Sequence, residues 1–106
     1  MTFSITARCP ETGMFGVAVT SSSMAVAARC AFARAGVGAV ASQNITDPRL
    51  GPRGLDLMAG GMSAAEALDL ILEEHDHREY RQLVLVDGAG EAAHYSGKHT
   101  LGTHNV

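Results

Sequence analysis

Two segments at the start of the chain alternate strictly in side-chain character, and this alternation is the strongest constraint on the fold. Residues 2–8 place hydroxyl side chains at every second position, with apolar ones between them, and residues 14–20 separate larger apolar side chains from small ones. A period of two is typical of a β-strand. Pro10 and Gly13 supply turn chemistry between the two segments. The sequence therefore predicts an antiparallel hairpin in which residues 21–23 end the second strand beside the start of the first.

The rest of the chain predicts a mixed set of elements. Ser63 and Glu66 form a capping box at the start of an amphipathic helix whose apolar positions recur every three to four residues. The segment 24–35 is rich in alanine and is either a short helix or an irregular crossing. The remaining expected elements are a strand over 36–44, a short helix over 53–59, and a second hairpin with strands over 82–86 and 92–96. This order predicts an α+β fold with helices on one outer face.

Length and composition indicate one thin-cored domain over residues 1–106. Hydrophobic residues make up 46% and charged residues 18% of the chain, which is apolar for a domain of this size. Twelve glycines and many alanines favour close packing of backbones. The side chains of the predicted strands indicate cover on both faces, yet the pattern supplies one layer of helices. We therefore expect the missing cover to come from a second sheet or from another chain.

Charge and hydropathy exclude several classes of protein. The formal net charge is −3 with no basic stripe, which argues against nucleic-acid binding. The uncharged residues 13–28 are interrupted by hydroxyl side chains and glycines and do not resemble a membrane span. There is no basic segment followed by an apolar one at the start, and there are two cysteines. The sequence predicts a cytoplasmic protein with reduced thiols.

Thr2 is a candidate catalytic nucleophile. If Met1 is removed, Thr2 carries both a hydroxyl and a free α-amine, whose reference pKa is about 7.7–8.0. Such an amine can accept the hydroxyl proton at neutral pH, so one residue supplies both nucleophile and base. With Met1 attached, Thr2 is an ordinary strand residue with its hydroxyl in solvent.

Four polar residues at strand ends are further candidates. Ser21 and Ser22 could orient a nucleophile or donate to a developing oxyanion, or could cap the next segment. Gln43 and Asn44 end the third predicted strand, and their amides suit an oxyanion or a substrate amide. The alternative for this pair is turn hydrogen bonding.

Histidine, cysteine and glycine patterns do not indicate a bound group. None of the five histidines has the spacing of a metal-binding motif, and we expect neither metal nor cofactor. Gly36 and Gly38 lack the strand–loop–helix setting of a nucleotide-binding loop. Cys30 lies near two arginines in sequence, which allows either a lowered thiol pKa or a buried structural cysteine.

Several segments together carry a family resemblance. They are TFSITARCPETGMFGVAV, ARAGVGAVASQ, GPRGLDLMAGGMSAAEAL and RQLVLVD. The chain resembles the amino-terminal half of a bacterial family, domain of unknown function 1028, which is grouped with the N-terminal nucleophile (Ntn) hydrolases. The resemblance implies a four-layer αββα sandwich, of which this chain supplies about half. It also implies an amidohydrolase that cleaves an amide or peptide bond through a Thr, Ser or Cys at the start of a chain.

The resemblance assigns roles residue by residue. Thr2 matches the opening threonine, Ser21 the serine after the second strand, and Gln43 the glutamine after the third, and these form the expected catalytic set. Ser22 and Asn44 are the expected substrate-binding residues. Cys9 departs from the family, which usually has an acidic residue there.

Members of this family are about twice as long as the present chain. The chain is then either a fragment or one product of a self-cleaving precursor, whose nucleophile would begin the partner chain. Both cases predict a second chain or identical subunits that complete the sandwich, and a small amide or peptide substrate. The alternative is a non-catalytic binding or assembly module that retains the fold.

Overall fold

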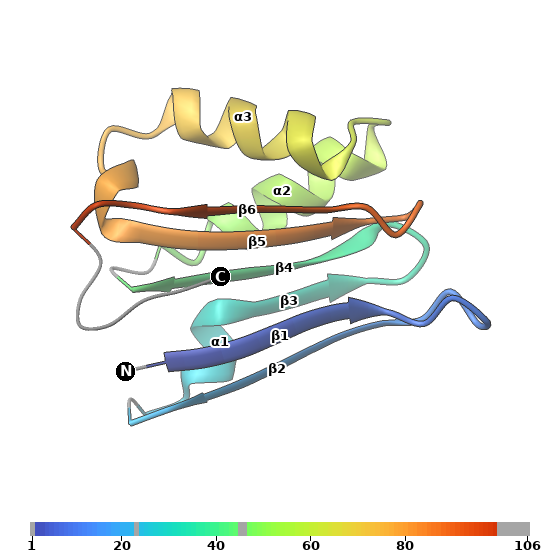
Figure 1. Ribbon diagram of the computed structural model, residues 1–106, viewed down its shortest axis with the longest axis horizontal. Helices are drawn as coiled ribbons and strands as arrows, with labels where there is room; N and C mark the ends of the chain where they lie inside the picture. The colour runs from blue at the N-terminus through green and yellow to red at the C-terminus, as the bar shows by residue number, and fades with distance from the viewer. Residues whose placement is uncertain (1, 23, 45–46, 100–106) are drawn as a thin grey trace.

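The chain forms six strands and three α-helices within residues 2–22, 24–44 and 47–99, which the structure, a computed structural model, describes (Figure 1). In chain order the elements are β1 (Thr2–Arg8), β2 (Phe15–Ser21), α1 (Val26–Cys30), β3 (Ala31–Arg34), β4 (Gly38–Asn44), α2 (Leu50–Ala59), α3 (Ala64–Glu74), the 3₁₀ turn η1 (Arg78–Tyr80), β5 (Arg81–Asp87) and β6 (Ala92–Ser96). The predicted α+β class is confirmed.

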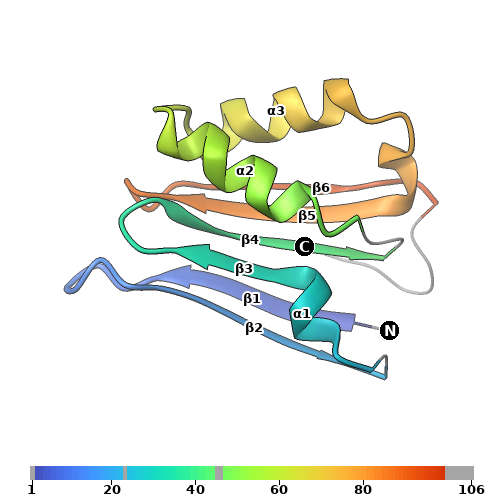
Figure 2. The same cartoon turned by 180° about the vertical axis from the view of Figure 1, so that it is seen from behind.

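The strands form two antiparallel sheets that pack face to face. β1 and β2 make a two-stranded ribbon, and β3, β4, β5 and β6 make a four-stranded sheet in that order. Helices α2 and α3 cover one face of the four-stranded sheet, and the ribbon lies on the other face (Figures 1 and 2). β1 lies over β4 and β5, whereas β2 lies over β3 and β4. The described residues therefore form three layers: helices, a four-stranded sheet and a two-stranded ribbon.

The main core lies between the helices and the four-stranded sheet. Val40, Leu83 and Leu85 of the sheet are fully buried against Leu50 of α2 and Ile71 of α3. The predicted capping box is present: the Ser63 hydroxyl accepts from the Glu66 N–H at 3.2 Å, and the Glu66 carboxylate accepts from the Ser63 N–H at 3.1 Å. This cap starts α3 so that its apolar face meets the sheet.

The second interface, between sheet and ribbon, is built from small side chains. Because strand residues alternate in direction, Ala39 and Ala41 lie on the face of β4 opposite Val40. That face meets the ribbon, and the two alanines are 0% and 2% exposed. Small side chains let the two backbones approach closely, in agreement with the packing expected from the composition.

β1 turns its hydroxyl side chains inward and its large apolar ones outward. Thr2, Ser4 and Thr6 are half-buried against the four-stranded sheet. Phe3 and Ile5 lie on the outer face of the ribbon with 64% and 65% of their surface exposed. The inner face of β1 is thus polar, which brings hydroxyl groups into the space between the sheets.

Three sequence predictions need correction. The segment 24–35 contains a strand that was not predicted, β3, because its helix-favouring alanines pair with β4 from Ala31 to Arg34. The strand predicted over 36–44 begins at Gly38. The helix predicted over 53–59 begins at Leu50, so Pro52 is its third residue, where the missing N–H costs nothing.

Candidate functional site

Thr2 and Ser21 lie side by side at one end of the ribbon. They are partners across the β1–β2 ladder, as the hairpin prediction requires. The Thr2 hydroxyl donates a hydrogen bond to the Ser21 hydroxyl, with 3.0 Å between the two oxygens. The hairpin therefore holds two hydroxyl groups together at the first residue of β1.

The same end of the molecule collects polar residues from the other sheet. β1 and β5 begin here, whereas β2, β4 and β6 end here (Figure 1). Gln43, near the end of β4, lies on the same face as Ala39 and Ala41 and so faces the ribbon. The hydroxyl pair and Gln43 thus belong to the same end of the space between the sheets.

Gln43 belongs to a chain of side-chain hydrogen bonds that crosses three strands. Its amide Nε2 donates to Oε1 of Gln82 on β5 at 2.6 Å, and Nε2 of Gln82 donates to the Ser96 hydroxyl on β6 at 3.0 Å. Gln43 and Gln82 are 7% and 6% exposed. The Gln43 amide is thereby held in one orientation, while its buried Oε1 has no hydrogen-bond partner among the described residues.

Gln82 and Ser96 are site residues that sequence reasoning missed. The available signal was a glutamine next to the continuously apolar centre of a strand. Its meaning depends on the register, which places Gln82 directly between Gln43 and Ser96. That register joins strands far apart in the chain.

The two expected substrate-binding residues, Ser22 and Asn44, lie at the ends of different strands. Ser22 follows β2 and is exposed. Asn44 is the last residue of β4 and pairs with Arg81 across the ladder, but its side chain lies outside the described part of the structure.

Asp47 adds a buried negative charge just after β4. Hydrogen bonds from the Arg49 side chain, at 2.9 Å to Oδ1 and 2.7 Å to Oδ2, lower the pKa of Asp47 to about 2 against the opposing effect of burial. The Arg49 N–H and the charges of Arg49 and Arg81 contribute to this lowering of the pKa. Asp47 is 8% exposed and remains ionised at neutral pH.

This shift predicts a loss of stability in acid. The folded-state pKa of Asp47 is about 2, below the ordinary value of 3.8. The contribution of Asp47 to stability is therefore complete above the unfolded-state pKa and is lost as the pH falls through the folded-state pKa. Arg49 is 85% exposed, so solvent screens the pair, and we expect a contribution of about 1 kcal/mol. Between about pH 5 and about pH 2, the free energy of unfolding of Asp47→Asn should fall by about 1 kcal/mol less than that of the parent protein. Urea unfolding at each pH measures this difference. The exposed Asp69→Asn is the control, and equal losses in parent and Asp47→Asn would contradict the assignment.

The acidic, histidine and cysteine side chains do not gather into a metal site in the described part of the chain. Within residues 2–22, 24–44 and 47–99 there is no cluster of three or more His, Cys, Asp or Glu able to hold a metal ion. Cys30 is 3% exposed at the end of α1, which agrees with the structural interpretation of this cysteine. None of the helices in the described part of the chain is long and apolar enough to cross a membrane.

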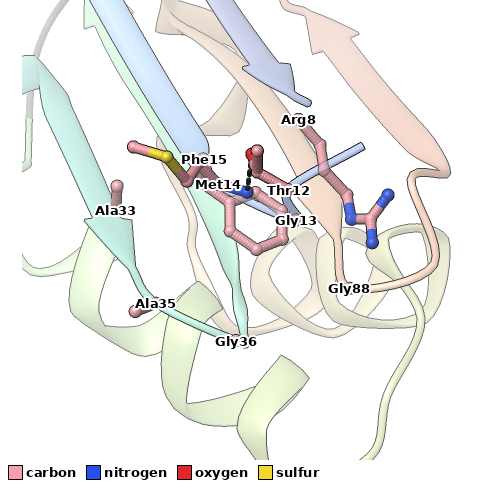
Figure 3. A pocket seen from close by; sticks show the side chains of 9 residues that line it. All are labelled: Arg8, Thr12, Gly13, Met14, Phe15, Ala33, Ala35, Gly36 and Gly88. Atoms are coloured by element: carbon pink, nitrogen blue, oxygen red, sulfur yellow. Dashed lines mark hydrogen bonds between the residues drawn. The ribbon is translucent and has the colours of Figure 1, made fainter. Parts of the chain in front are cut away.

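A pocket of about 550 Å³ lies at the opposite end of the sheets (Figure 3). It is lined by the turns between β1 and β2 and between β3 and β4, together with Arg8 and Gly88. None of the residues predicted for the site lines it.

Known proteins share the fold of this chain and its family. The fold is an α+β arrangement of a helical layer and two antiparallel sheets, with a hydroxyl pair and an amide chain at one end. The chain belongs to the family of unknown function (DUF1028), whose family model matches residues 2–106. The family resemblance seen in the sequence is thus confirmed.

A solved structure supports the same assignment. The crystal structure of a protein from Silicibacter pomeroyi, which carries the same family model, matches this chain with a TM-score of 0.89 and 31% sequence identity. The match covers 93% of this chain and 46% of that protein, so the present chain spans about half of its length. No curated protein matches the chain.

Proposed function

We propose that this chain carries the catalytic end of an amidohydrolase of the N-terminal nucleophile type. The observation that carries the proposal is the hydrogen bond of 3.0 Å between the hydroxyls of Thr2 and Ser21. Thr2 is the first residue of β1, which pairs with β2 and packs on the four-stranded sheet, so its side chain is positioned before any substrate arrives. A preorganised nucleophile of this kind suits the attack on an amide or peptide carbonyl.

The proposed reaction has two halves. After removal of Met1, the α-amine of Thr2 takes the proton from Oγ1, and Oγ1 attacks the carbonyl carbon of the substrate. The C–N bond then breaks, and the leaving amine takes that proton, which leaves an ester on Thr2. Water attacks the ester, releases the acid and restores the hydroxyl. No metal or cofactor is needed for this sequence of bond changes.

The neighbouring residues have supporting roles in the proposal. Ser21 accepts the hydrogen bond from Thr2 and so orients its side chain before attack. Gln43 is a supporting amide whose orientation is set by Gln82. Donors at this end, from a backbone N–H or a side-chain amide, stabilise the oxyanion. Ser22 and Asn44 are the proposed contacts to the rest of the substrate.

A further part of the proposal concerns the complete sandwich. Phe3 and Ile5 leave a large apolar surface on the outer face of the ribbon, which favours a covering layer. The chain also spans about half the length of the related crystal structure. We infer that a second chain, a further segment or identical subunits supply that layer and give a four-layer αββα sandwich. Self-cleavage of a longer precursor is one route to such a second chain.

A non-catalytic assembly module is the second candidate. The exposed apolar face of the ribbon favours it, because this face needs a partner whether or not chemistry occurs. The two candidates differ in one requirement, since an enzyme of this type needs a nucleophile at the start of a chain and the module does not.

Two mass measurements test the proposed function on protein expressed from its natural coding sequence. The first is the intact mass of every species under denaturing conditions, where we expect loss of Met1. The second is a peptide map after treatment with a β-lactone, which acylates activated hydroxyls and should modify Thr2. Retention of Met1, with no acylation of any chain start, would exclude the enzyme and favour the module. A second chain that begins with an acylated Thr, Ser or Cys would move the nucleophile from Thr2 to that residue.

The covering layer predicts the effect of charge on the ribbon. A Phe3→Lys and Ile5→Lys double variant should lower the free energy of unfolding by more than about 2 kcal/mol if these side chains are covered. The same changes on an open face should alter it by less than about 0.5 kcal/mol. Thr20→Lys, at an exposed position opposite Phe3, tests whether the outer face of the adjacent strand is covered as well. Urea unfolding and size-exclusion chromatography of the naturally expressed protein give the answer.

A further inference from the structure

The pocket opposite the Thr2 end is formed where three turns meet. Gly13 belongs to the β1–β2 turn, Gly36 to the β3–β4 turn and Gly88 to the β5–β6 turn, and all three line it. Its volume of about 550 Å³ falls in the range of small-molecule sites. The pocket is therefore large enough for a compact organic ligand.

The walls combine an apolar surface with a single charge. The Phe15 ring lies in the middle of the pocket view, with Ala33 and Ala35 on one side and the Arg8 guanidinium on the other (Figure 3). Arg8 is the one charged residue among those that line the pocket. An apolar body and an anionic group on the same ligand would match this division.

Arg8 lies beside two of the turns at this end of the sheets. It is partly buried at the end of β1, between two turns whose glycines have positive φ angles, +75° at Gly13 and +84° at Gly90. A Cβ atom at Gly13 would lie 3.6 Å from Nη2 of Arg8, and one at Gly90 would lie 3.9 Å from its Cδ. The Arg8 side chain thus lies beside two glycine turns.

No protein carboxylate satisfies this guanidinium in the described part of the chain. None of the ion pairs within 4.0 Å involves Arg8, and its side chain makes no hydrogen bond there. Asp87, which precedes Gly88, accepts from the backbone N–H groups of Ala64, Ala89 and Glu91 at 2.9–3.1 Å. Its carboxylate is therefore already engaged.

We propose that this pocket binds a small monocarboxylate with an aromatic or aliphatic body. The planar guanidinium of Arg8 pairs with the carboxylate through two parallel hydrogen bonds, and the body lies on Phe15. Thr12 also lines the pocket, and its hydroxyl oxygen accepts from the Met14 N–H at 3.3 Å. This inference is independent of the proposed hydrolysis, which belongs to the other end of the sheets.

The test uses benzoate and benzamide, which share a shape and differ in charge. Isotope-labelled protein, expressed from its natural coding sequence, is titrated with each compound while its amide NMR signals are followed. Benzoate should shift the signals of Gly13, Gly36 and Gly88 to saturation, and benzamide should bind at least about tenfold more weakly, since it cannot form a charge-assisted pair. A failure of benzoate to produce saturable shifts would overturn the proposal, including the case in which other parts of the protein fill the pocket.

Variants separate the Arg8 contact from general charge effects. Arg8→Gln should weaken benzoate binding at least about tenfold, and Arg8→Lys should have an intermediate effect because it keeps the charge but loses the planar fork. Arg34→Gln is the matched control: Arg34 lies at the same end of the sheets but pairs with Asp56 at 3.0 Å, and it should bind benzoate like the parent. Unchanged binding in a folded Arg8→Gln variant, or equal binding of benzamide and benzoate by the parent, would refute the proposed site.

Discussion

Replacing Thr2 by alanine should lower kcat/KM for amide hydrolysis at least about a thousandfold, because the variant has no hydroxyl to attack the carbonyl. Thr2→Ser keeps a hydroxyl and an α-amine and should retain measurable turnover. The assay follows amine release from a set of amino-acid p-nitroanilides, using protein expressed from its natural coding sequence. The intact mass of each variant must be measured alongside, since the mechanism requires the α-amine of residue 2 to be free.

Thr20 provides a matched control for this experiment. It is a threonine in the paired strand, one residue before Ser21, but its side chain lies on the exposed outer face of the ribbon. Thr20→Ala also removes a threonine hydroxyl from this end of the hairpin, and it should leave kcat/KM unchanged. Full activity in Thr2→Ala would place the nucleophile on another residue, and a loss in Thr20→Ala equal to that in Thr2→Ala would indicate a structural effect.

Replacing Asp87 by alanine should have the largest effect on stability, about 3 kcal/mol of the free energy of unfolding. Its carboxylate, 6% exposed, accepts from the buried N–H of Ala64 at 2.9 Å and from the N–H groups of Ala89 and Glu91 at 3.0 and 3.1 Å. One residue thus ties the start of α3 to the β5–β6 turn. Removing it leaves buried donors without partners, and each hydrogen bond to a charged group contributes about 1.5–3 kcal/mol.

The electrostatics of Asp87 agree with this role. Burial raises its pKa, but the hydrogen bonds from the N–H groups of Ala64, Glu91 and Ala89 together lower the pKa by more than burial raises it. The pKa of Asp87 therefore lies below the ordinary 3.8. A carboxylate near the start of α3 also interacts favourably with the helix dipole.

Urea unfolding near neutral pH measures the effect of the Asp87 variants. Asp87→Asn retains one acceptor oxygen and should recover about half of the loss. Asp69→Ala, at an exposed position on α3, should change stability by less than about 0.5 kcal/mol. A loss below about 1 kcal/mol in Asp87→Ala would show that these hydrogen bonds are replaced by water.

The candidate site was predictable to the extent that it depends on local structure. The pairing of Thr2 with Ser21 follows from the length of each strand and the short turn between them, so the first hairpin sets it. Gln43 could be marked as a polar residue at the end of a strand. Its partners could not be found in this way, because Gln82 is 39 residues further along the chain and meets it through the register of β4 and β5.

The strand β3 shows the opposite situation, in which local preference misled. Its segment, AFAR, follows directly on the short helix α1 and shares its alanine-rich composition. Pairing with β4 makes it a strand, in which Ala31 and Ala33 stand opposite Ala41 and Ala39 of β4. Tertiary contacts thus overrode the helical preference of the residues.

The sequence by itself determined the strand periods, the turns and the capped helix, because each of these depends on residues within a few positions of one another. It also determined membership of the family, which the match over residues 2–106 confirms. The tertiary structure decided which face of β1 turns inward. Alternation defines two faces of a strand, but the neighbouring layers decide which one is covered. Here the hydroxyls of Thr2, Ser4 and Thr6 face the small alanines of β4, while Phe3 and Ile5 face outward, and this choice brings a hydroxyl nucleophile candidate into the space between the sheets.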